Sequence, residues 1–172
     1  TAWTAGAPRD DAPEPLSAAA ARRYLQVPAG HERVAALARR WTQGSEDDAA
    51  RVERLVARLR DSGDYRYSLT MPEVGDRRPL EVFLFEARRG HCEYYSTALA
   101  VMLRTLGVPA RNVTGFLGGR YNAYGRYYAL SQGDAHSWVE AWLPDRGWVP
   151  FDPTPPARDA MAPDPGLFAT FR

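Results

Sequence analysis

The chain has 172 residues, 45% of them hydrophobic and 25% charged, and a formal net charge of +1, which fits one folded domain. The charge balance excludes the electrostatic footprint of a nucleic-acid-binding protein, and no stretch approaches the ~20 apolar residues that span a bilayer. The single cysteine, Cys92, excludes an internal disulfide.

The first half of the chain reads as helical. Apolar residues recur at helical spacing and predict helices over 16–27, 31–44 and 45–59, the third capped by the segment 45–48. Residues 65–69 alternate like a strand, and 80–87 are ambiguous between helix and strand. A further helix is predicted over 92–106, ended by Gly107 and Pro109. Its expected buried stripe is Leu99, Met102, Leu103 and Leu106.

The second half reads as strands separated by turns. We predict strands over 110–116, 124–130, 135–143 and 148–151, with turns at Gly118-Gly119, Gln132-Gly133 and 144–147. Helices followed by a strand meander argue for an α+β fold.

Cys92 stands at the start of the long helix, directly after Gly90-His91. Unpaired amides and the helix dipole at that position favour a thiolate, and the same amides can donate to an oxyanion. The alternative is a small, buried and inert side chain. His91 is expected only to help shape the site, because neighbours at a helix start point apart.

A base and an orienting group follow in the strands. His136, at the start of a strand, is a candidate general base for the thiol, or else a histidine bonded into the sheet. Asp152 is a candidate orienter of the imidazole, or else the cap of the turn formed by Asp-Pro-Thr.

The hairpin register decides whether these two side chains meet. A four-residue loop over 144–147 puts Asp152 on the opposite face from His136. A three-residue loop over 144–146 places Asp152 opposite Trp138, which makes His136 its diagonal neighbour. The spacing permits the pair without demanding it.

Other residues receive secondary roles. Trp138 either packs or forms a wall of the cleft, and Tyr67 either packs or donates to an oxyanion. Glu140 is expected to pair with an arginine. His136 and Glu140 do not form a metal motif, so we expect no metal and no cofactor.

Two longer stretches, "RRGHCEYYSTALAVMLRTLGVPARNVTGF" and "DAHSWVEAWLPDRGWVPFDPT", resemble the transglutaminase-like superfamily, in particular its bacterial membrane-anchored members. The resemblance covers about residues 23–156. It implies a papain-like α+β fold with a Cys-His-Asp triad, in which Cys92 is the nucleophile, His136 the base and Asp152 the orienter. Ser137 departs from a commoner alanine, and His91 from a commoner aromatic residue.

The resemblance also sets the expected organisation and activity. We expect a lead-in over 1–22, a core domain over 23–156 and a Pro-rich tail over 157–172, in an extracytoplasmic domain of a larger membrane-anchored protein. The expected reaction is acyl transfer from an amide through a thioester, with an amine or water as acceptor and a peptide, protein or cell-wall peptide as substrate. The alternative is a non-catalytic peptide- or cell-wall-binding module of the same fold.

Overall fold

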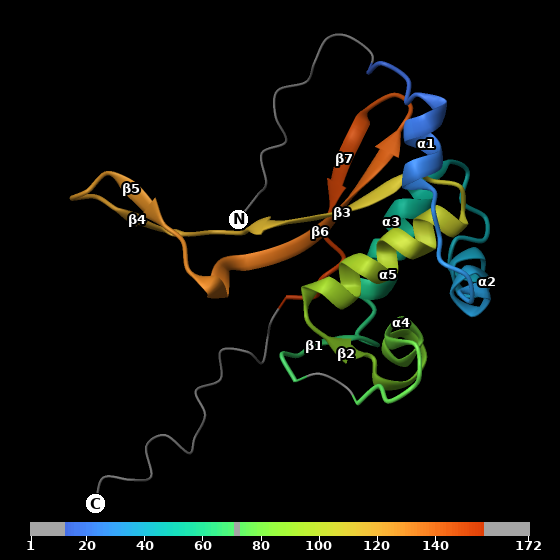
Figure 1. Ribbon diagram of the computed structural model, residues 1–172, viewed down its shortest axis with the longest axis horizontal. Helices are drawn as coiled ribbons and strands as arrows, with labels where there is room; N and C mark the ends of the chain where they lie inside the picture. The colour runs from blue at the N-terminus through green and yellow to red at the C-terminus, as the bar shows by residue number, and fades with distance from the viewer. Residues whose placement is uncertain (1–12, 71–72, 157–172) are drawn as a thin grey trace, which may run out of the picture.

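The computed structural model describes residues 13–70 and 73–156, and within them helices precede a small sheet (Figure 1). The helices are α1 Ala18–Tyr24, α2 Glu32–Trp41, α3 Asp48–Arg60, α4 Pro79–Glu81, which continues as the π-helical segment Val82–Ala87, and α5 Cys92–Thr105. The strands are β1 Arg66–Tyr67, β2 Arg89–Gly90, β3 Ala110–Phe116, β4 Arg120–Asn122, β5 Tyr127–Ala129, β6 Ala135–Leu143 and β7 Gly147–Phe151.

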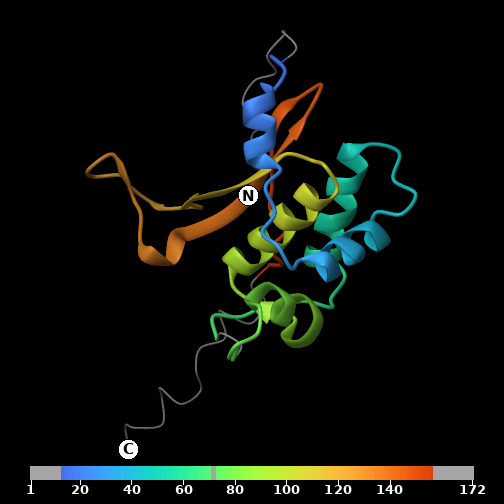
Figure 2. The ribbon, with the colours of Figure 1, turned by 45° about the vertical axis from the view of Figure 1, so that its right-hand side comes forward.

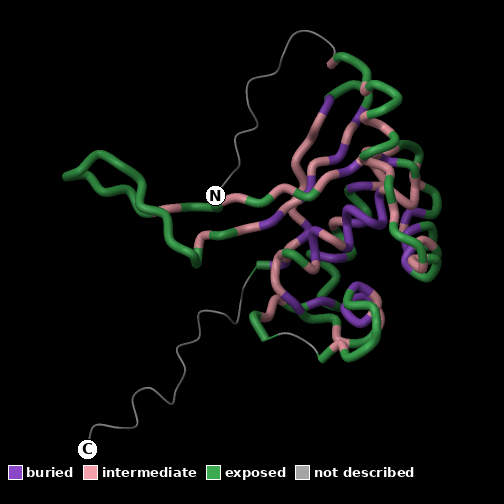
Figure 3. The backbone as a smooth tube through the Cα atoms, viewed as in Figure 1, coloured by how far each residue is buried: buried purple, intermediate pink, exposed green. Residues whose placement is uncertain are grey.

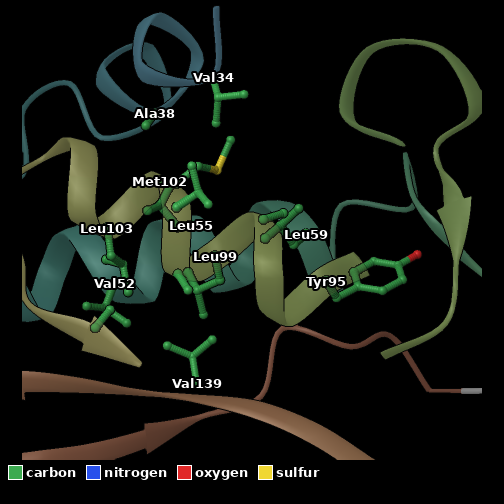
Figure 4. Close-up of a cluster of buried hydrophobic side chains, with 14 of the residues drawn as sticks. Val34, Ala38, Val52, Leu55, Leu59, Tyr95, Leu99, Met102, Leu103 and Val139 are labelled. Carbon is green, nitrogen blue, oxygen red and sulfur yellow. The ribbon is translucent and has the colours of Figure 1, made fainter. Parts of the chain in front are cut away.

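Helix α5 is the centre of the core, between the sheet on one side and α2 and α3 on the other (Figures 2 and 4). Leu99, Met102 and Leu103 are buried as predicted, whereas Leu106 is only partly buried. The predicted stripe was nevertheless too narrow, because contact on two sides also buries a second set of α5 side chains. That set is Tyr95, Ser96, Ala98, Ala100 and Val101.

The helices α2 and α3 bury the apolar positions that their periodicity predicts, among them Val34 and Leu37 on α2 and Leu55 and Leu59 on α3. The predicted capping segment 45–48 contains the N-cap of α3, which is Asp47. Its carboxylate accepts a hydrogen bond from the Ala50 amide at 2.7 Å. A carboxylate at this position also stabilises the positive end of the helix dipole.

The main sheet is antiparallel and has the order β3-β6-β7. Leu143 pairs with Gly147, so the β6–β7 hairpin has the three-residue loop, and Asp152 comes next after the Phe151–Val139 pair. Strand β6 alternates along its length, with one set of side chains buried against α5 and the other half-buried on the opposite face. The buried set is Ser137, Val139, Ala141 and Leu143.

The opposite face of the sheet carries a cluster of tryptophans and charges. Trp142 and Trp148 are cross-strand partners with ring centroids 5.6 Å apart. The predicted pairing of Glu140 with an arginine is confirmed, since Arg111 lies 2.6 Å from its carboxylate. The same guanidinium lies over the Trp148 ring at 4.3 Å, and Tyr24 packs edge-on against that ring, which ties α1 to the sheet.

Residues 80–87, which the sequence left ambiguous, are helical. Two predicted strands are shorter than expected. The strand predicted over 65–69 is limited to two residues, because its parallel partner β2 offers only two before α5 begins. The strand predicted over 124–130 is limited to β5, since residues 123–126 form the turn of a hairpin between β4 and β5. A hydrogen bond from the Gly125 amide to the Asn122 side chain closes this turn at 2.9 Å. β4 was not predicted.

Part of the predicted lead-in, 1–12, and the whole predicted tail, 157–172, lie outside the described residues. In the described part of the lead-in, Ser17 caps α1. No helix in the described ranges is both long and apolar enough to cross a membrane.

Candidate active site

Cys92 is the first residue of α5, with His91 as its N-cap. The His91 ring accepts a long hydrogen bond, 3.4 Å, from the Glu93 amide, and the ring packs edge-on against Tyr94. A Cβ on Gly90 would lie 3.0 Å from the Tyr94 ring, so any side chain here would have to displace that ring slightly. The histidine beside the cysteine therefore caps the start of the helix.

The protein environment acts on the thiol in both directions. Burial raises the pKa of the Cys92 thiol, donation from the Ser137 and Glu93 amides lowers it, and the Glu93 carboxylate raises it again. The net result is a pKa above the ordinary value, so the helix start alone does not produce a thiolate. Ionisation of this thiol needs a proton acceptor.

A buried polar contact holds the helix against the strand that carries His136. The Ser96 and Ser137 hydroxyls are 2.7 Å apart and both residues are fully or almost fully buried. Ser96 is one helical turn after Cys92 and so lies on the same face of α5. The Ser137 backbone amide donates toward the Cys92 sulfur, which places the thiol beside the start of β6.

His136 and Asp152 meet, as the three-residue loop requires. The His136 Nε2 lies 2.8 Å from Asp152 Oδ2. Asp152 Oδ1 accepts the Thr154 amide at 3.0 Å, so the turn cap considered as an alternative exists together with the histidine contact. Burial raises the pKa of Asp152, but the bonds from His136 and Thr154 outweigh it and hold that pKa below its usual value.

The arrangement assigns the two imidazole nitrogens. Because Nε2 is taken by Asp152, Nδ1 is the nitrogen left to exchange a proton with a thiol. The described atoms include no hydrogen bond between Cys92 and His136. Hydrogen bonds between catalytic side chains are often long in a free enzyme and tighten only in the substrate complex.

A cavity of about 310 Å³ opens beside the histidine–aspartate pair. Its described lining includes Tyr67, His136, Asp152 and Leu117, but not Cys92, His91 or Trp138. Tyr67 pairs with Gly90 across the small sheet, and burial together with the charge of Cys92 raises the pKa of its phenol. Tyr67 therefore lines the cavity and is near enough to Cys92 for the two groups to influence each other electrostatically.

Trp138 packs against the histidine rather than lining this cavity. The two rings are nearly parallel, at 22°, with centroids 6.4 Å apart. The indole covers Gly115 on β3, where a Cβ would come within 2.9 Å of the ring. This packing limits the orientations that are open to the imidazole.

Several residues of the site were not predicted from the sequence, because they have no motif of their own. They are the buried pair Ser96 and Ser137 and the cavity-lining residues Arg60 and Leu117. The one available signal was a serine at an apolar-face position of both α5 and β6. Tyr65 is excluded as an oxyanion donor because it is buried and its hydroxyl donates to the Leu84 carbonyl at 2.9 Å. No group of three metal-ligating side chains occurs in the described ranges.

Fold and site together define a class: a papain-like α+β domain with a thiol at the start of its central helix and a histidine–aspartate pair on the adjoining strands. The chain belongs to the transglutaminase-like superfamily, whose family model matches residues 35–153. The family resemblance and the fold expected from the sequence are confirmed.

Two curated relatives match most of this chain. The protein-glutamine gamma-glutamyltransferase of Pseudomonas aeruginosa is 41% identical over 133 residues, covering 77% of this chain and 20% of that protein. The uncharacterized protein YebA of Bacillus subtilis is 38% identical over 140 residues, covering 77% and 19%. The chain thus spans about a fifth of the length of the curated relatives it matches.

Solved structures agree. The crystal structure of the periplasmic domain of TgpA from Pseudomonas aeruginosa, bound to ethylmercury, superposes with a TM-score of 0.73 at 38% identity, over 80% of this chain and 49% of that one. A Cytophaga hutchinsonii protein proposed to be a cysteine protease gives a TM-score of 0.59 at 20% identity, over 81% and 43%, and supports the fold alone.

Proposed function

We propose that this domain transfers an acyl group from an amide through a thioester on Cys92. His136 Nδ1 takes the thiol proton, and the sulfur attacks the amide carbonyl carbon. The carbon–nitrogen bond then breaks while His136 returns the proton to the departing amine. Asp152 holds the imidazole and stabilises its charged form, and the amides at the start of α5 donate to the transient oxyanion.

The second half of the cycle reverses the roles. An amine or water attacks the thioester carbonyl, His136 accepts its proton, and the carbon–sulfur bond breaks to restore the thiol. An amine gives the transglutaminase outcome and water gives the amidase or peptidase outcome. The observation that carries the proposal is the His136–Asp152 pair at 2.8 Å, with Nδ1 left open next to the residue whose amide faces the thiol.

The sequence limits the partners of such a reaction. All 22 basic residues are arginine, so these 172 residues contain no lysine amine and cannot be joined to one another through lysine. We infer that an amine acceptor comes from another molecule, such as a cell-wall peptide, and that the donor is the amide of a peptide or protein. By analogy with the periplasmic domain of TgpA, the domain acts outside the cytoplasm.

The test is mass spectrometry of the intact chain after incubation with benzyloxycarbonyl-glutaminyl-glycine. The expected adduct is a single acyl group on Cys92, absent from His136→Ala and from Cys92→Ala. Because the chain has one cysteine, an adduct elsewhere contradicts the thioester. Hydroxylamine should release the acyl group as a hydroxamate.

A binding module that retains the fold is the second candidate. Two observations favour it: the raised pKa of the thiol, and the lack of a thiol–imidazole hydrogen bond between the described side chains. Iodoacetamide labelling of the native chain and of His136→Ala, with a donor-site peptide present, separates the two candidates. Labelling of Cys92 at neutral pH in the native chain but not in His136→Ala supports the enzyme. Labelling of both proteins only at alkaline pH supports the binding module.

A further inference from the structure

A hairpin rich in exposed aromatic side chains projects from the edge of the site. We define the aromatic arm as residues 116–131, which contain β4 and β5. In the described part of the chain, seven of the eight exposed large hydrophobic side chains belong to it. They are Phe116, Leu117, Tyr121, Tyr124, Tyr127, Tyr128 and Leu130. Figure 3 shows the arm as a green extension beyond the packed body.

The composition of the arm is that of a protein-binding loop. It contains four tyrosines, two arginines, Asn122, Ser131 and several glycines, and no acidic residue occurs between Phe116 and Gly133. Tyrosine and arginine are the side chains enriched in binding hot spots, and tyrosine with glycine, serine and asparagine is typical of antibody loops. Its two arginines give the arm a charge of +2, which is complementary to an acidic partner.

The aromatic side chains are arranged rather than scattered. Tyr121 and Tyr128 are cross-strand partners with ring centroids 5.0 Å apart. Tyr124 at the tip is fully exposed. Seven exposed large hydrophobic side chains within sixteen residues, with Arg120 and Arg126 among them, are typical of a surface that a partner covers.

The arm begins at the candidate active site. Gly115 pairs with His136 and Phe116 with Ala135, so the two strands that leave toward the arm pass the histidine. Leu117 lines the same cavity as His136 and Asp152, and its amide donates to the Asp134 carbonyl at 2.7 Å. A molecule bound along the arm is therefore held at the mouth of the cavity.

We infer that the aromatic arm docks an acidic stretch of the protein that supplies the amide. This inference rests on the proposed acyl transfer and names its substrate class. A phospholipid surface is the less favoured occupant, because interfacial membrane segments combine their apolar face with several cationic residues, whereas this arm carries two arginines and four of its seven exposed large hydrophobic side chains are tyrosines.

The test measures binding separately from chemistry. The whole chain carrying Cys92→Ala is titrated with β-casein, an acidic glutamine-containing protein, by biolayer interferometry. Arg120→Glu and the double variant Tyr121→Ser/Tyr128→Ser are each expected to weaken binding by about tenfold. Arg58→Glu, an exposed charge reversal on α3, is the matched control and should leave the affinity unchanged.

Equal affinity in all variants, or binding only to phosphatidylglycerol vesicles, overturns the docking proposal.

A parallel measurement uses the protein that retains Cys92. Its acylation by benzyloxycarbonyl-glutaminyl-glycine reports the chemistry alone and should be the same with and without the arm substitutions. Arm-dependent β-casein binding without any acylation leaves docking supported and rejects the acyl transfer. Acylation without arm-dependent binding supports the acyl transfer and rejects the docking. Unchanged urea unfolding midpoints show that the variants are folded.

Discussion

The region of β3 and β6 and the aromatic arm that extends from it differ sharply in how far their side chains are buried. Where β6 lies under α5, every second side chain is buried, and the serine pair and Val139 fix the strand against the helix. Beyond His136, β3 and β6 continue as the aromatic arm, with no helix over it and exposed side chains throughout (Figure 1). Packing thus fixes the histidine-bearing strand against the helix, whereas the arm beyond it is exposed.

The largest expected difference between the two regions is in stability. Leu99 is fully buried at the centre of the α5 contacts, so Leu99→Ala should lower the free energy of unfolding by about 2–5 kcal/mol. Leu130→Ala, an exposed leucine of the arm, should change it by less than about 0.5 kcal/mol. Urea denaturation followed by circular dichroism measures both, and similar losses would contradict the division.

The buried serine pair sharpens the same comparison. Ser137→Ala removes the Ser96–Ser137 hydrogen bond, while the Ser96 hydroxyl keeps its 3.3 Å contact with the Glu93 carbonyl, so the change should cost about 0.5–1.5 kcal/mol. The double change Ser96→Ala/Ser137→Ala removes both hydroxyls and should cost less than the sum of the single changes. Additive effects in urea unfolding would show that the two hydroxyls do not depend on each other.

Asp152 should make stability depend on pH. Its pKa in the folded protein lies below the ordinary value of 3.8, so its contribution is complete above that value and is lost as the pH falls through the folded pKa. The stability advantage of the native protein over Asp152→Asn should therefore be constant near neutral pH and shrink below about pH 4. An advantage that is the same at neutral pH and throughout the acid range would contradict the assigned bond.

A smaller effect is expected at the thiol. The Glu93 carboxylate raises the pKa of Cys92, so Glu93→Gln should lower it and shift the pH profile of iodoacetamide labelling toward acid. Glu86→Gln, an exposed acidic residue that does not act on the thiol, is the control. An unchanged or alkaline-shifted profile would show that the carboxylate does not act on the sulfur.

The sequence was sufficient where local pattern decides the outcome. Strong periodicity located α5, β3 and β6 with their true starts, and the ordered motifs identified the family. The meeting of His136 and Asp152 depended on one loop residue, which pattern alone left open. The hairpin of the arm was missed because the Asn122–Gly125 turn was not recognised, and the Ser96–Ser137 contact joins residues that only tertiary packing brings together.

Asp152 gives one oxygen to the imidazole and the other to the Thr154 amide. A substitution of Asp152 would therefore disturb both the local turn at Thr154 and the proposed role of His136. A descendant that had abandoned catalysis would still have a conformational reason to keep the aspartate. Across related genes, the thiol and the imidazole are consequently better markers of a working enzyme than the carboxylate.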